Sequence, residues 1–267
     1  YNIIQNAIFN YSVENISYDN SSDVWIIDNK YTSKYIGICS GYLTSPNIDI
    51  ENNELKNFKG NIVHTRDFNN LKLDLLDNKN VLIVGNGASA CDILNNLEKN
   101  NVKCNLTVIY KSPKYFIGKY IFNIPISSFL NHFLLLFGKY SPLYLYKFIV
   151  MLVIYFYFGI YHEIPQSKMN SKNLIANTII HDKIRNNTLV YLKDEIKCCK
   201  QKNIILKNNI LLNIDTIILA TGYKEEYVFF KEQPCKEKYL QIFDEKFKNC
   251  AFIGFSPSYN WPKVSEK

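Results

Sequence analysis

The sequence predicts an α/β fold built around a parallel sheet. A buried strand at 80–84, a helical pattern at 89–99 and a second strand at 106–110 form a β-α-β unit of about 30 residues, the size of a parallel crossover. Short apolar runs typical of strands recur in the first and last thirds of the chain. An intensely apolar and aromatic insert separates these parts at 120–161.

The outer thirds are expected to contribute short strands. The run at 35–39 ends in Ser40-Gly41, as a buried strand does where it meets a ligand or a tight corner. The polar stretch at 49–59 predicts a loop, and 173–185 predicts a helix. Further strands are expected at 24–27, 188–192, 203–206, 215–219 and 250–253.

The insert at 120–161 is predicted to form two helices broken near 138–142. The second arm, 143–161, carries one charge, Lys147, and its length alone would suit a transmembrane helix. A single crossing would, however, split one sheet across the bilayer. Three alternatives remain: helices packed in the core or lining a substrate channel, a monotopic insertion into one leaflet, or a true transmembrane span. The many tyrosines favour an interface.

The amino-acid composition limits the classes of protein to which this chain can belong. The 267 residues allow one large domain or two smaller ones, and 47% hydrophobic with 21% charged residues excludes a disordered or collagen-like chain. The net charge of +7 suits an anionic ligand without choosing between nucleotide, nucleic acid and lipid. The seven cysteines form no C-x-x-C pair and no zinc-spaced cluster, so we expect reduced thiols, an intracellular protein and no metal site.

A glycine motif predicts a dinucleotide site. Gly85-x-Gly87-x-x-Ala90 lies between the strand at 80–84 and the following helix, which is the context this fingerprint requires. The first Gly makes the turn, the second lets a pyrophosphate approach, and Ala90 lets helix and strand pack closely. The pyrophosphate would rest on the helix N-terminus, where Ser89 is expected to act as the cap. The predicted contacts are Gly85, Asn86, Gly87, Ala88, Ser89 and Ala90.

The end of the second strand bears on the choice of nucleotide. A carboxylate there binds the ribose hydroxyls of NAD, but this chain has Lys111-Ser112 and then Lys114. Cations favour a 2′-phosphate, so the sequence predicts NADPH, bound by Lys111 and Ser112. A solvated lysine is the alternative interpretation.

Several spaced motifs together resemble the flavin-containing monooxygenases and their Baeyer–Villiger relatives. The glycine loop continues to Asp92 as in the NADPH loop of that family, and the other matching segments occur in the family order. These segments are Phe58-x-Gly60-x-x-x-His64-x-x-x-Phe68, Ala220-Thr221-Gly222-Tyr223, Ile38-Cys39-Ser40-Gly41-Tyr42 and Phe252-Ile253-Gly254-Phe255.

The resemblance implies two Rossmann-type lobes. The NADPH-binding lobe would comprise 71–212 with the helical insert 120–161. Parts of an FAD-binding lobe would comprise 1–70, with the linker signature, and 213–267. The family's first glycine fingerprint has no counterpart here, so we expect a central and C-terminal part of a family protein that binds FAD weakly by itself.

The resemblance also implies the chemistry. The cofactors would be FAD and NADPH, and the reaction the oxygenation of a nitrogen or sulfur nucleophile, as in an N,N-dimethylaniline monooxygenase. Gly41, Thr221 and Gly222 would line the flavin, and His64 would order the linker. No catalytic side chain is assigned, because the flavin carries the reaction.

The implied partners are a small nucleophilic substrate and oxygen, without nucleic acid. Monotopic membrane contact through 120–161 would place the protein in the cytoplasm or on the cytoplasmic or endoplasmic reticulum membrane surface. The alternative is a catalytically inactive remnant that serves as a nucleotide- or membrane-binding module. A disulfide-reductase relative is disfavoured by the lack of a paired-cysteine motif.

Overall fold

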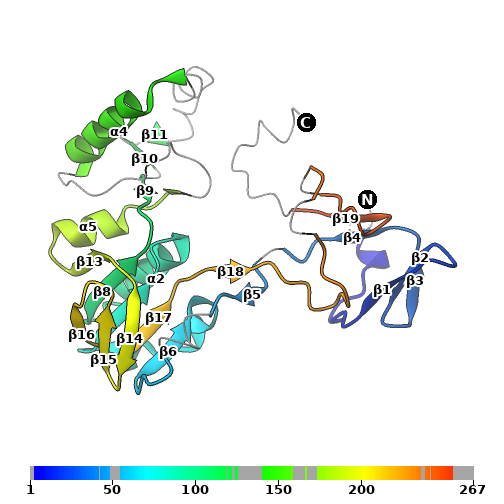
Figure 1. The fold of residues 1–267 in the computed structure, drawn as a ribbon, viewed down its shortest axis with the longest axis horizontal. Coiled ribbons are helices and arrows are strands. Elements are labelled where there is room, and N and C mark those ends of the chain that lie inside the picture. The colour runs from blue at the N-terminus through cyan, green and yellow to red at the C-terminus, as the bar shows by residue number, and fades with distance from the viewer. Residues whose placement is uncertain are drawn as a thin grey trace. The chain divides into compact units, whose positions relative to one another are not determined.

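The computed structural model describes residues 3–41, 43–48, 55–118, 120–121, 124–125, 140–158, 166, 173–235, 238–240 and 242–254. The chain divides into two compact units (Figure 1). Unit 1 comprises 1–45 and 223–267, and unit 2 comprises 46–222. The sequence-based boundaries were 70/71 and 212/213. The units divide elsewhere because β6 (Asn61–His64) and β17 (Thr216–Leu219) are both strands of the unit 2 sheet.

Unit 2 is built on a five-stranded parallel sheet with the order β13-β8-β7-β17-β6. Besides β6 and β17, this sheet contains β7 (Asn80–Val84), β8 (Asn105–Tyr110) and β13 (Leu189–Lys193). Thr216 of β17 pairs with Val81 on one side and with Asn61 on the other. The predicted parallel α/β fold is therefore confirmed.

Alternate residues of β7 face two different layers. Val81 and Ile83 belong to the core that includes helix α2 (Ala88–Lys99). Leu82 and Val84 belong to the core on the other face, which includes residues of an antiparallel meander. The meander strands are β14 (Ile196–Lys200), β15 (Asn203–Leu206) and β16 (Leu211–Asn213). Coverage on both faces is what a parallel sheet requires.

Helix α2 follows β7 as predicted. Its buried positions Ala90, Leu94 and Leu97 recur at the i, i+4, i+7 spacing of one helical face. Two 3-10 helices, η2 (Thr65–Asn70) and η3 (Leu73–Leu76), precede β7.

The segment predicted to be a helix at 173–185 is only partly helical. Residues Leu174–Ile175 form β12, which pairs in parallel with β9 (Tyr115–Phe116), and helix α5 spans Ile179–Arg185. The side chain of Asn177 accepts a hydrogen bond from Ile179 N at 2.9 Å, which favours a helix start there rather than at 173.

The described part of the apolar insert contains one of the two predicted helices. The prediction of helix at 120–125 is wrong, because β10 (Tyr120–Ile121) and β11 (Ile124–Pro125) pair as an antiparallel hairpin. Residues 126–139 lie outside the described ranges. Helix α4 spans Leu143–Phe158. Across the described ranges, no helix is both long and apolar enough to cross a membrane. The monotopic contact has no support here and stays a prediction.

Unit 1 combines an antiparallel sheet with a parallel strand pair. The sheet has the order β1-β2-β3, and β4 pairs with β19. Trp25 of β2 is 1% exposed at the centre of the core, and its Nε1 donates to Lys248 O at 3.0 Å. The strands are β1 (Ile16–Asp19), β2 (Val24–Ile27), β3 (Tyr31–Ser33), β4 (Ile36–Ile38) and β19 (Cys250–Phe252). The remaining elements are η1 (Ile3–Asn6), β5 (Ser45–Pro46) and β18 (Tyr223–Lys224).

Candidate dinucleotide-binding site

The turn after β7 requires glycine at its first position. Gly85 has φ +108°, and a Cβ on it would lie 2.4 Å from the backbone oxygen of Ala220, which follows the neighbouring strand β17. Its N–H donates to Ile109 O at 2.8 Å, so the turn stays bound to β8 as well. Gly85 is therefore fixed by packing, whether or not a nucleotide is bound.

Gly87 serves a different purpose. It is the N-cap of α2 with φ −79°, an extended conformation that any residue adopts, and a Cβ on it would meet nothing within 4 Å. The predicted cap at Ser89 is wrong, because Ser89 lies inside the first turn and no side chain caps the helix. Ala88, the first residue of α2, is exposed. The helix start therefore has open space at its N-cap, which fits a phosphate group.

Asn86 supports the turn rather than facing solvent. It is 5% exposed, and its Nδ2 donates to Ser112 O at 3.1 Å and to the Tyr191 hydroxyl at 2.8 Å. The Tyr191 ring stacks on Tyr110 of β8 with centroids 4.3 Å apart. These contacts connect the glycine loop to the segment after β8, and so bring Ser112 close to the loop as the sequence predicts for one binding site.

Lys111 follows β8 but is already paired. Its Nζ lies 3.0 Å from Oε2 of Glu195, and the lysine side chain is 68% exposed. Glu195 also pairs with Lys207 at 3.0 Å, and hydrogen bonds from both lysines lower the pKa of Glu195. Lys114 is half-buried, and burial lowers its pKa. No sequence motif pointed to Glu195 or Lys207, because both lie in a segment far from Lys111 along the chain.

Cys91 lies under the loop on the buried face of α2. Burial raises the pKa of this thiol to about 12, so it is protonated at neutral pH and is no nucleophile. Among the described residues, no group of three or more His, Cys, Asp or Glu side chains could hold a metal ion.

The four signature residues upstream of β7 are structural. A Cβ on Gly60 would lie 2.3 Å from Asp215 O and 2.5 Å from the Phe58 ring. Phe68 is 3% exposed in the core under α2. His64 is 5% exposed, its Nδ1 accepts from Arg66 N at 3.2 Å, and its Nε2 lies 3.1 Å from Gly222 O.

His64 joins two of the predicted motifs. A carbonyl oxygen only accepts hydrogen bonds, so the Nε2 facing Gly222 carries the proton while Nδ1 accepts. Asn47 N also donates to Gly222 O at 3.0 Å, and the Thr221 hydroxyl donates to Asn47 O. The histidine thus orders the two segments at which the chain enters and leaves unit 2, which is the structural role expected for it.

The glycines that follow β4, β17 and β19 share one conformation, and two of them, Gly41 and Gly222, are predicted to face a flavin. Gly41 after β4 has φ +78°, Gly222 after β17 has φ +80°, and Gly254 after β19 has φ +81°. A Cβ on each would meet nothing within 4 Å. Each of these three strands is therefore followed by a turn that favours glycine and leaves its backbone accessible.

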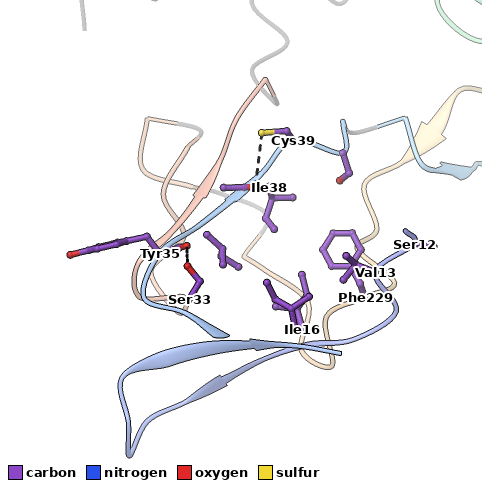
Figure 2. A pocket seen from close by; sticks show the side chains of 12 residues that line it. Ser12, Val13, Ile16, Ser33, Tyr35, Ile38, Cys39 and Phe229 are labelled. Carbon is purple, nitrogen blue, oxygen red and sulfur yellow. Dashed lines mark hydrogen bonds between the residues drawn. The ribbon is translucent and has the colours of Figure 1, made fainter. Parts of the chain in front are cut away.

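Unit 1 contains a cavity of about 580 Å³ along β4. Figure 2 shows the side chains of Val13, Ile16 and Phe229 gathered around it, while the Tyr35 ring points away. Cys39 and Ser40 of the predicted flavin segment also line it. Within the described part of the chain, the residues that line this cavity are mostly apolar and include no lysine or arginine.

Comparison with known proteins places this geometry in a family. Residues 26–251 match the family model described as flavin-binding monooxygenase-like. The chain belongs to this family. The match includes the signature residues, the glycine loop and the strand–glycine segments that end at Gly41 and Gly222.

Curated relatives extend well beyond this chain. The probable indole-3-pyruvate monooxygenases YUCCA9 and YUCCA10 of Arabidopsis thaliana are each 22% identical to it. The alignments cover 81% and 82% of this chain but 53% and 58% of the relatives. The chain therefore spans little more than half the length of the curated relatives it matches.

Solved structures share the fold. Cyclohexanone monooxygenase from Rhodococcus sp. Phi1 bound to NADP+ superposes with a TM-score of 0.61 at 15% identity, over 91% of this chain and 60% of that one. The OTEMO complex with FAD and NADP gives a TM-score of 0.65 at 14% identity, again over 91% and 60%. At these identities the likeness concerns the fold alone.

Proposed function

We propose that this chain supplies the NADPH-binding part of an FAD- and NADPH-dependent monooxygenase that oxygenates a nitrogen or sulfur nucleophile. Membership of the flavin-binding monooxygenase-like family supports the oxidoreductase class. The observation that carries NADPH binding is the start of α2, where Gly87 faces open space and no side chain caps the helix.

The residues of unit 2 divide the work of holding the nucleotide. The first turn of α2 offers backbone N–H groups and the positive end of the helix dipole to the pyrophosphate. Asn86 holds the loop against the segment after β8 by donating to Ser112 O. In this proposal Ser112 contacts the ribose side of the nucleotide. Bound FAD, when present, supplies the redox and oxygen chemistry.

Gly87 gives the sharpest test of nucleotide binding. Asp and Asn are both good N-cap residues, so Gly87→Asp and Gly87→Asn should fold as well as the wild type. Both side chains occupy the phosphate space, but only Asp adds a negative charge. We expect NADPH affinity to fall about tenfold in Gly87→Asn and at least about a hundredfold in Gly87→Asp. Isothermal titration calorimetry measures both, and wild-type affinity in Gly87→Asp would contradict the proposal.

The substrate class is tested separately. Oxygen uptake and NADPH oxidation by the FAD-loaded monooxygenase to which this chain contributes its NADPH-binding part are compared with amine or thioether substrates and with a cyclic ketone, because the similar structures include cyclohexanone monooxygenases. The proposal expects product from the nitrogen or sulfur compound. If only the ketone were converted, the proposed nitrogen or sulfur oxygenation would have to be replaced by oxygenation of a ketone.

A further inference from the structure

One carboxylate oxygen holds two lysine side chains near the glycine loop. Oε2 of Glu195 lies 3.0 Å from Nζ of Lys111 and 3.0 Å from Nζ of Lys207. Lys111 follows β8, whereas Lys207 follows β15 of the meander, so the two cations come from different layers of unit 2. The three charges sum to +1.

The backbone fixes this cluster at the ends of the strands. Lys193 pairs with Tyr110 in the parallel ladder, and Asp194 N donates to Tyr110 O at 3.1 Å, which places Glu195 beside Lys111. Lys207 N donates to Glu195 O at 2.9 Å. The end of the strand that follows the first crossover helix is where the adenosine ribose of a dinucleotide binds. The cluster therefore lies at the ribose side of the predicted site.

We propose that Lys207 is a second cation for the 2′-phosphate of NADPH and that Glu195 sets how tightly this phosphate binds. The inference rests on the proposed function and deepens it. Lys114, the second cation expected from the sequence, is a poorer candidate because it is half-buried and burial disfavours its charged form.

The ion pairs are weak enough for a phosphate to compete with them. The side chains of Lys111 and Lys207 are 68% and 58% exposed, and exposed pairs contribute little. A 2′-phosphate carries more charge than a carboxylate and has three acceptor oxygens, so it can engage both ammonium groups. Glu195 then faces that phosphate as a like charge. In the free protein the Glu195 carboxylate holds the two lysines close together. When the nucleotide is bound, the same carboxylate repels its 2′-phosphate and so weakens binding.

The test separates the 2′-phosphate from the rest of the nucleotide. Adenosine 2′,5′-bisphosphate and 5′-AMP are titrated calorimetrically into the full chain and into Lys207→Gln, Glu195→Gln and Lys197→Gln. Lys197 is the matched control, since it is a lysine of the same meander whose Nζ donates to Asn209 at 3.2 Å. Thermal unfolding checks that each variant is folded.

We expect Lys207→Gln to weaken the bisphosphate roughly tenfold and to leave 5′-AMP unchanged. Lys197→Gln should change neither, and Glu195→Gln should strengthen the bisphosphate roughly threefold or more. The inference is overturned if Lys207→Gln acts no more strongly than Lys197→Gln, if it weakens both ligands equally, or if Glu195→Gln weakens the bisphosphate. If the wild-type chain bound neither adenosine 2′,5′-bisphosphate nor 5′-AMP, that result would instead refute the proposed function.

Discussion

At the scale of single residues, the two glycines of the loop differ in what they require. Gly85 is constrained by φ +108° and by Ala220 O at 2.4 Å from the position of a Cβ, whereas Gly87 has neither constraint. The same motif therefore contains one residue that the fold needs as glycine and one that the fold leaves unconstrained. The sequence pattern alone does not distinguish them.

We predict that Gly85→Ala lowers the free energy of unfolding by about 3 kcal/mol, from backbone strain and overlap with Ala220. Urea denaturation measures the loss. Gly41→Ala is the comparison, since Gly41 has a similar positive φ but open space around its Cβ, and it should cost less. Equal losses in the two variants would show that the overlap with Ala220 contributes nothing.

At the scale of elements, Asp215 connects two neighbouring strands through its charge. Its Oδ2 accepts from Asn80 N at the start of β7 at 3.1 Å, and its Oδ1 pairs with Lys202 at 2.7 Å. The hydrogen bond from Lys202 and then that from Asn80 lower the pKa of Asp215. A carboxyl group whose pKa is lowered by folding stabilises the folded protein at pH values above its unfolded-state pKa of about 4. This stabilisation is lost as the pH falls through the folded-state pKa.

Asp215→Asn should therefore be less stable than the wild type by about 1 kcal/mol at pH 6, and the difference should shrink as the pH falls below about 4. Urea midpoints at pH 6 and pH 3 give the comparison. Asp67→Asn is a control, because Asp67 pairs at 3.3 Å with the adjacent Arg66 and both side chains are about half exposed. A difference for Asp215→Asn that stays constant with pH would contradict the assignment.

Elements differ in how well the sequence predicts them. β7, α2 and β8 were predicted to within one residue, because buried runs and a helical period lie on either side of a glycine turn. The hairpin at 120–125 and β12 were missed, because two-residue strands leave no period in the sequence. The glycine loop between β7 and α2 was likewise predicted, while nucleotide binding at this loop stays a prediction. Glu195 and Lys207 were not predicted, because their contacts with each other and Lys111 depend on how β13, β15 and β8 are arranged in space.

At the scale of the whole molecule, unit 2 is one continuous segment with its own cores on both faces of its sheet. Its first and last residues are held together, since Asn47 N donates to Gly222 O at 3.0 Å. Unit 1, in contrast, needs two segments that are far apart in the chain.

We predict that residues 46–222 produced alone fold cooperatively and bind NADPH within about threefold of the affinity of the full chain. Circular dichroism during thermal unfolding and calorimetric titration test this. Loss of cooperative unfolding in this segment would mean that unit 2 depends on unit 1 for its structure.

We also predict that the full chain, purified with excess FAD, retains far less than one flavin per chain. In its described parts, unit 1 offers the glycine turns after β4 and β19 and an apolar cavity, but no α-helix start to hold a pyrophosphate. Visible absorbance after gel filtration measures the flavin. A stoichiometric spectrum would show that FAD has a phosphate site outside these elements.

The pairing of β4 with β19 has a consequence for the order in which the protein is made. Ile36 pairs with Cys250, so β4 leaves the ribosome long before its partner strand and the whole of unit 2 is synthesised in between. Closing so long a loop is slow and costs entropy while the intervening chain is unfolded. Once unit 2 has folded, its ends meet at Asn47 and Gly222, and the effective loop becomes short. A mutation confined to unit 2 can therefore prevent unit 1 from forming in a cell, although it changes none of the residues of unit 1.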